Sequence, residues 1–235
     1  MALAAVPGAA QNETMVTDES SQRQRLKSDT FGAIWRVGTG ADTRIQRDLS
    51  SARPWAAWLA RRLALREARA LGRLRGQRGF PQLYAVQRDG LTRSFLEGQP
   101  MFEARPTDVD WFIDALRLLR RMHRAGVTHN DLAKEPNWLV TDDGRAAIVD
   151  FQLASTFKKR SRWFRVLAHD DLRHLLKHKR TYRPEALTAR QRRILATPAW
   201  PSRVWRATGK PVYLFITRRL LNWSDREGAA DRGRD

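Results

Sequence analysis

Two aspartates and one asparagine stand in the middle of the chain, where elements of regular structure are expected to end. Asp131 follows the segment 126–130, Asn137 precedes an apolar run, and Asp150 closes the run 147–149. Carboxylate and amide oxygens suit Mg²⁺ that is held together with substrate phosphates. A second carboxylate beside such a cation can orient or deprotonate a hydroxyl group. The three residues together indicate phosphate chemistry, although each alone is a common loop-capping residue.

An acidic residue interrupts the apolar face of a helix predicted over residues 51–74, with Ser51 as its cap and Pro54 in its first turn. The apolar residues recur at helical spacing: Trp55, Leu59, Leu63, Ala70, Leu71 and Leu74. Glu67 falls on the same stripe. A buried carboxylate costs free energy unless a cation meets it, so we expect a basic partner for Glu67. The alternative is that Glu67 lies at the rim of the stripe and reaches solvent.

The remaining segments alternate between strand and helix patterns. Runs 31–37 and 43–49 read as an antiparallel pair with a Gly-containing turn, and 82–87 and 91–96 as a second pair. Residues 108–124 have helical periodicity and end before Gly126. Residues 138–151 read as a hairpin, and the rest of the chain as basic helices interrupted by prolines.

The central motifs resemble those of the protein-kinase-like superfamily. The run 129–131, His-Asn-Asp, is similar to its His-Arg-Asp catalytic loop, and 150–152, Asp-Phe-Gln, to its Asp-Phe-Gly metal motif. Asn137 matches the metal-binding Asn, six rather than five residues after Asp131. The resemblance covers about residues 26–179 and is strongest between 129 and 152.

Upstream residues fall in the order that the same family shows. Residues 30–35 resemble the end of a Gly-rich loop and its second strand, and Glu67 stands where the helix Glu should be. Arg47 occupies the place of the third-strand Lys, and guanidinium is bulkier than ammonium at a phosphate clamp. Lys27, placed in the expected Gly-rich loop, is an alternative cation. The first two loop glycines are missing and Gln152 replaces Gly. A pseudokinase that binds nucleotide without transferring phosphate is therefore an alternative.

The resemblance implies an α+β, two-lobed fold. A small antiparallel N-lobe with one helix would span 26–98, and a reduced, mainly helical C-lobe would span 99–225, between flexible tails at 1–25 and 226–235. Asp131 would be the catalytic residue, and Asn137 and Asp150 would hold Mg²⁺. The remaining ATP-binding residues would be Gly32, Ile34, Ile45, Arg47, Glu67, Leu96 and Leu139.

The implied function is transfer of the ATP γ-phosphate to a hydroxyl. Resemblance to the small bacterial RIO kinases implies a protein Ser or Thr as acceptor, and places Asp171 as a buried support in the segment 168–174. Resemblance to lipopolysaccharide-core kinases implies a lipid-linked sugar instead. Asp170, His174 and His178 share helical spacing and could offer a metal site, although a polar face of a basic helix is the simpler interpretation.

Charge is concentrated toward the C-terminus. The 235 residues carry a formal net charge of +19, of which residues 156–235, with 21 basic and 7 acidic residues, contribute +14. Four tryptophans interleave with arginines there: Trp163, Trp200, Trp205 and Trp223. This composition favours peripheral contact with an anionic membrane surface, and packing of the Trp residues in a helical core is the alternative. Nucleic acid is disfavoured as a partner, and a binder that uses only the basic tail is the remote alternative.

Several classes of protein are excluded by composition. The chain has no cysteine, which excludes disulfide scaffolds, thiolate metal sites and cysteine nucleophiles. No apolar run is long enough to predict a membrane span, and the N-terminal segment lacks the pattern of a signal peptide. These features favour a cytoplasmic protein, with contact at the inner membrane surface as the variant.

Overall fold

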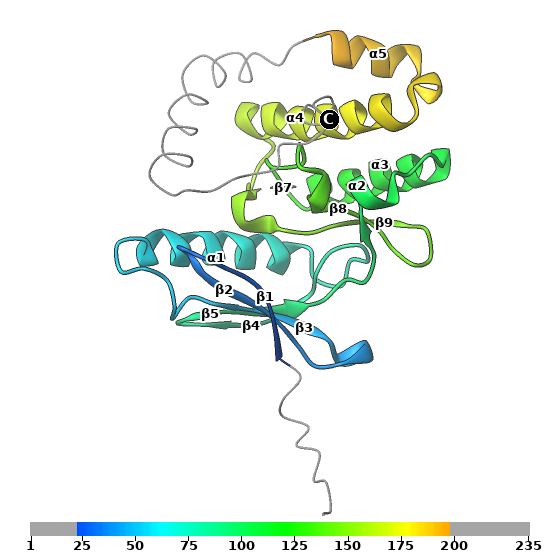
Figure 1. Ribbon diagram of the computed structural model, residues 1–235. Coiled ribbons are helices and arrows are strands. Elements are labelled where there is room, and N and C mark those ends of the chain that lie inside the picture. The colour runs from blue at the N-terminus through cyan, green and yellow to red at the C-terminus, as the bar shows by residue number, and fades with distance from the viewer. Residues whose placement is uncertain (1–22, 198–235) are drawn as a thin grey trace, which may run out of the picture.

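The computed structural model describes residues 23–197 and is an α+β structure in which helices accompany a five-stranded antiparallel sheet (Figure 1). The strands are β1 Arg23–Asp29, β2 Gly32–Val37, β3 Arg44–Asp48, β4 Leu83–Gln87 and β5 Gly90–Ser94. They are ordered β1-β2-β3-β5-β4. Both predicted strand pairs are confirmed, because β2 pairs with β3 and β4 pairs with β5 in antiparallel register.

Two glycines allow the neighbouring strands to close on the end of β3. Gly32 has φ +119°, and a Cβ atom there would lie 2.2 Å from the carbonyl oxygen of Asp48. Gly90 has φ +156°, and its Cβ would lie 1.9 Å from the carbonyl oxygen of Arg47. No side chain fits at either glycine. Strands β2 and β5 can therefore approach the end of β3 closely, one on each side of that strand.

The helix predicted over 51–74 begins later than expected. Helix α1 spans Ala57–Arg73, and Ala56, not Ser51, precedes it without a side-chain cap. The intervening backbone is engaged elsewhere, because the N–H of Arg53 donates to Thr30, and just before it the N–H of Leu49 donates to Asp89. The prediction of Trp55 on the buried stripe was wrong, since Trp55 is 56% exposed. The buried face consists of Ala60, Ala64, Glu67, Ala68, Ala70 and Leu71.

The chain after β5 forms helices and two small sheets. The helices are α2 Met101–Ala104, α3 Val109–Arg124, α4 Arg162–Tyr182 and α5 Ala189–Ala196, with short 3-10 turns η1 Gly40–Asp42, η2 Glu135–Asn137, η3 Phe151–Leu153 and η4 Pro184–Ala186. One small sheet contains β6 Gln99–Pro100, β8 Trp138–Val140 and β9 Ala146–Ile148, and the other pairs β7 Val127–Thr128 with β10 Ser155–Thr156. The predicted hairpin is confirmed, with shorter strands.

The main core lies between α3, α4 and the small sheets. Its largest fully buried side chains include Trp111, Trp138, Phe80 and Phe151. Figure 1 shows α1 between the five-stranded sheet and this helical part of the molecule. Arg66 of α1 connects the two parts, because its Nε donates to the carbonyl of Ala154 at 3.1 Å and its Nη2 to that of Leu153 at 3.0 Å.

Some predictions concern residues outside the described range. Residues 1–22 and 198–235, with Trp200, Trp205 and Trp223, lie outside the described residues. The last three residues of the segment predicted as a tail, 23–25, belong to β1. Trp163 is 66% exposed at the start of α4. Between residues 23 and 197, no helix has both the length and the apolar character needed to cross a membrane.

Candidate functional site

The structure brings Asp131 and Asn137 into direct contact. The Nδ2 group of Asn137 donates to the carbonyl oxygen of Asp131 at 2.9 Å and to its Oδ2 at 3.2 Å. The carbonyl of Asn137 accepts from the N–H of Val149 at 3.0 Å, which ties this loop to the residue before Asp150. Because Nδ2 faces Asp131, the amide oxygen is the atom of Asn137 that remains for a cation.

Asp150 has a conformation that is uncommon for a residue other than glycine. Its φ is 65° and its ψ 68°, in the left-handed region, immediately before the turn η3. Its Oδ1 is buried and has no hydrogen-bond partner among the described residues. Backbone strain and an unsatisfied buried acceptor both cost free energy, and they occur together most often where a site binds something.

The carboxylate of Asp150 and the amide oxygen of Asn137 suit a hard cation that is also held by phosphate oxygens. Within residues 23–197, no cluster of three His, Asp or Glu side chains is placed to hold a metal by itself. The other metal site considered from the sequence, with Asp170, His174 and His178 as ligands, is not formed. His174 pairs with Asp170 at 3.4 Å, whereas Nε2 of buried His178 contacts the carbonyl of Leu132 at 2.8 Å.

Burial raises the pKa of the Asp131 carboxyl, against the opposing effects of Lys134 and His129, and the charge of Asp150 raises it further. The folded protein therefore binds a proton at Asp131 more readily than the unfolded chain does. The stability that this proton contributes is present below pH 3.8 and is lost as pH rises through the raised pKa. We expect the unfolding free energy of Asp131→Asn, relative to the parent, to increase over this range. Urea unfolding at a series of pH values measures it, and a difference that falls with pH would contradict the expectation.

A buried carboxylate on α4 holds the loop that carries Asp131. Asp171 is 1% exposed, and its two oxygens accept from the backbone N–H groups of His129 and Asn130, both at 2.9 Å. Its Oδ2 also lies 3.1 Å from Nε2 of His123 on α3. The prediction that Asp171 is a buried support is confirmed. Asn130, with φ 69°, donates to the carbonyl of Leu153 at 2.7 Å, which fixes the other side of the loop.

Glu67 is buried and paired, as expected from its position on α1. Its carboxylate is 3% exposed and lies between two arginines, 3.8 Å from Nε of Arg47 and 3.0 Å from Nε of Arg93. The alternative of a solvent-exposed Glu67 at the helix rim was wrong. Sequence reasoning missed Arg93, which stands opposite Ile45 across the β3–β5 pairing.

The other predicted ATP-binding residues lie on the sheet and on the segment that leaves it. Ile34 pairs with Arg47 across β2 and β3, and Ile45 is buried on β3. Leu96 is half-buried two residues after β5, in the connection to β6. Leu139, also buried, stands opposite Pro100 in the β6–β8 pairing. The connection that carries Leu96 therefore leads directly to the strand that faces Leu139.

Lys27 does not occupy a loop. It lies in strand β1, with an ion pair to Asp29 at 3.3 Å and a side chain that is 47% exposed. The prediction of its position in a Gly-rich loop was wrong, because the first strand extends to Asp29 and the turn is confined to Thr30 and Phe31. Of the two candidate cations, Arg47 is the one that lies beside Glu67, at 3.8 Å.

Comparison with known proteins adds no assignment to this geometry. A scan against protein-family models finds no match to the chain, and a search of curated proteins finds none either.

Proposed function

We propose that the chain is an ATP-dependent phosphotransferase of the protein-kinase-like superfamily, with its two-lobed fold. The observation that carries the proposal is the assembly of Asp131, Asn137 and Asp150 in one loop system, tied to α1, the helix whose Glu67 pairs with Arg47 of β3. Arg66, the neighbour of Glu67, forms the tie through its bonds to the carbonyls of Leu153 and Ala154. The five-stranded sheet with α1 corresponds to the N-lobe of this proposal, and the part from β6 onward to its C-lobe.

The proposed mechanism assigns a separate task to each polar group. Asp131 orients the acceptor hydroxyl and accepts its proton, for which its raised pKa makes it a better base. Asn137 and Asp150 would hold Mg²⁺, which neutralises charge on the transferring phosphoryl group when bound. Arg47 would contact the remaining phosphates, and Glu67, which also pairs with Arg93, would fix the position of Arg47. Most of the rate enhancement would come from this prearranged charge.

The acceptor in this proposal is a hydroxyl of a protein Ser or Thr, and the alternative is a lipid-linked sugar. Exposed Trp163, which stands beside Arg162 and Arg165 at the start of α4, favours the alternative, because aromatic and basic side chains together suit an anionic membrane surface. Peripheral contact of a cytoplasmic enzyme with that surface would then bring it to its acceptor.

The decisive experiment follows γ-phosphate transfer from labelled ATP by the full chain, with and without Mg²⁺. Autophosphorylation and loss of ATP are both recorded, because the acceptor is not fixed in advance. Transfer that EDTA stops and Mg²⁺ restores would support the proposal. Nucleotide binding without transfer would contradict it and favour the pseudokinase, and absence of both would exclude a nucleotide site.

The exchange of Arg47 for Lys separates an active enzyme from a pseudokinase. The ion pair of Arg47 with Glu67, at 3.8 Å, is longer than a hydrogen bond, so an ammonium group can replace the guanidinium without losing a forked pair. For an active enzyme we expect Arg47→Lys to change turnover by less than about tenfold, or about 1.4 kcal/mol in the barrier. Turnover that appears only in Arg47→Lys would identify a disabled site. Arg93→Lys, on the other side of Glu67, is the matched control.

A further inference from the structure

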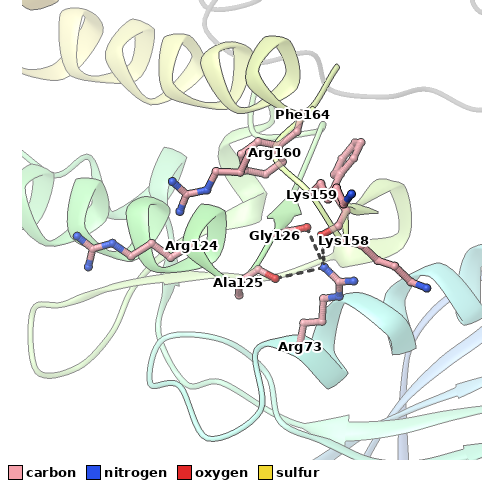
Figure 2. Close-up of a pocket in the computed structure, with 9 residues that line it drawn as sticks. Arg73, Arg124, Ala125, Gly126, Lys158, Lys159, Arg160 and Phe164 are labelled. Carbon is pink, nitrogen blue, oxygen red and sulfur yellow. Dashed lines mark hydrogen bonds between the residues drawn. The ribbon is translucent and has the colours of Figure 1, made fainter. Parts of the chain in front are cut away.

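A cavity of about 390 Å³ lies away from Asp131, at the other end of the β7–β10 pair. We call it the basic pocket, and five cationic residues are among those that line it: Arg73, Arg124, Lys158, Lys159 and Arg160 (Figure 2). The end of this pair nearer the candidate site is marked by Asn130, whose Nδ2 donates to Ser155 at 3.0 Å. The volume is within the range of small-ligand pockets, about 300 to 1,000 Å³.

The basic pocket carries positive charge that no acidic residue between 23 and 197 neutralises. No acidic residue lines it, and none of its five cations forms an ion pair with a carboxylate in the part of the chain that the structure describes. Like charges gathered around one concave space repel one another and raise its positive potential. An anion bound there would relieve this repulsion.

The backbone around the pocket is held in place by hydrogen bonds. Nη1 of Arg73 donates to the carbonyl oxygens of Ala125 and Gly126, both at 3.4 Å, and to that of Phe157. The N–H of Phe157 donates back to Gly126 at 2.8 Å. Gly126 has φ +73°, and a Cβ atom there would lie 2.5 Å from the carbonyl oxygen of Phe157. The two segments that Arg73 joins, at 125–126 and at 157, therefore form a fixed floor of the pocket.

Two exposed arginines, Arg124 and Arg160, lie at the rim of the pocket. Figure 2 shows the side chains of Arg124 and Arg160 extending to the same side of the pocket, whereas Lys158 extends away from it. Beside Arg160, buried Phe164 packs against Phe157 with ring centroids 5.5 Å apart, which anchors the start of α4. Guanidinium groups match the oxygens of a phosphate with paired hydrogen bonds, and their charge strengthens those bonds.

We propose that the basic pocket binds a phosphate-bearing ligand, a phosphate monoester or diphosphate, with Arg124 and Arg160 as its principal donors. This site is separate from the proposed nucleotide site and does not depend on it, because its cations lie outside the set Asp131, Asn137 and Asp150. The phosphate could belong to a soluble molecule or to a lipid headgroup, and both present the same dianionic oxygens to the pocket.

The test measures binding of inorganic pyrophosphate to the full chain by titration calorimetry. The test variant is Arg124→Gln/Arg160→Gln, and the matched control is Arg190→Gln/Arg192→Gln, which removes the same charge from exposed positions of α5. Circular dichroism and thermal unfolding check that each variant is folded. We expect the pocket variant to bind pyrophosphate at least about tenfold more weakly than the parent, because two charge-assisted donors are lost. The control should bind like the parent.

Equal binding by the parent and both variants would overturn the proposal, as would a parent that does not bind pyrophosphate. A similar loss in both variants would also overturn it, because general charge and not the pocket would then be responsible. Co-sedimentation with phosphatidylcholine vesicles, with and without phosphatidic acid, shows whether the bound phosphate belongs to a lipid or to a soluble molecule. If only the pocket variant loses binding to the vesicles that contain phosphatidic acid, the ligand is a lipid headgroup. If sedimentation is unchanged while the pocket variant binds pyrophosphate more weakly, the ligand is a soluble phosphate.

Discussion

Asp131→Asn is expected to reduce phosphate transfer by roughly 10² to 10⁴-fold, the usual contribution of a positioned base. The amide cannot accept a proton at neutral pH, but its oxygen can still accept from Nδ2 of Asn137, which now bonds Oδ2 of Asp131 at 3.2 Å. Loss of a negative charge should not weaken binding of ATP. We therefore expect the reduction to appear in kcat, measured with labelled ATP, while the nucleotide affinity is retained.

Asp89→Asn is the control for this variant, because it makes the same chemical change at a side chain that is 65% exposed and only weakly paired with Arg61 at 3.9 Å. The control should transfer phosphate like the parent. If Asp131→Asn retained full turnover, Asp131 would not be the base and the proposed mechanism would be wrong. If nucleotide affinity fell as much as turnover, the residue would serve in binding instead.

Asp171→Ala is expected to lower the free energy of unfolding by about 2 to 4 kcal/mol. The carboxylate accepts from the N–H groups of His129 and Asn130 and lies 3.1 Å from His123. Its removal leaves the two backbone donors without this acceptor, at about 1 to 3 kcal/mol each, and relief of the buried charge offsets part of the loss. Chemical denaturation monitored by tryptophan fluorescence measures the change.

The neighbouring residue supplies a matched control for this loss. Asp170 is 36% exposed and pairs with His174 at 3.4 Å, so Asp170→Ala should cost less than about 1 kcal/mol. Equal effects of the two substitutions would show that Asp171 is no special support. Asp171→Ala should also reduce transfer in protein that is still folded, because the loop of Asp131 loses its anchor.

Local patterns were sufficient to predict the strand pairs and the acid of α1. The pairs 31–37 with 43–49 and 82–87 with 91–96 follow from alternation and from glycine turns, which act within a few residues. The cation near Glu67 follows from the cost of a buried carboxylate. Arg93 could not be predicted as a second partner, because that requires knowing that β3 lies beside β5.

Long-range hydrogen bonds explain what periodicity missed. The segment before α1 has helix-forming residues, but the N–H of Arg53 donates to Thr30, and the helix begins only at Ala57. The loop of Asp131 was recognised by its motif alone. Its left-handed Asn130 and its support by Asp171 depend on α4, and no pattern within the loop specifies how it is held.

The support by Asp171 also determines the order in which the molecule can be completed during synthesis. The five-stranded sheet has all its strands once Ser94 has been added, whereas the loop at His129 needs an acceptor that comes 42 residues later. At about 5 to 20 residues per second, that interval is about 2 to 8 s. A nascent chain that has been synthesised only as far as His129 therefore contains the motif but lacks the carboxylate that holds its loop. The proposed phosphate chemistry would therefore begin only after the ribosome has delivered the first half of α4, as far as Asp171.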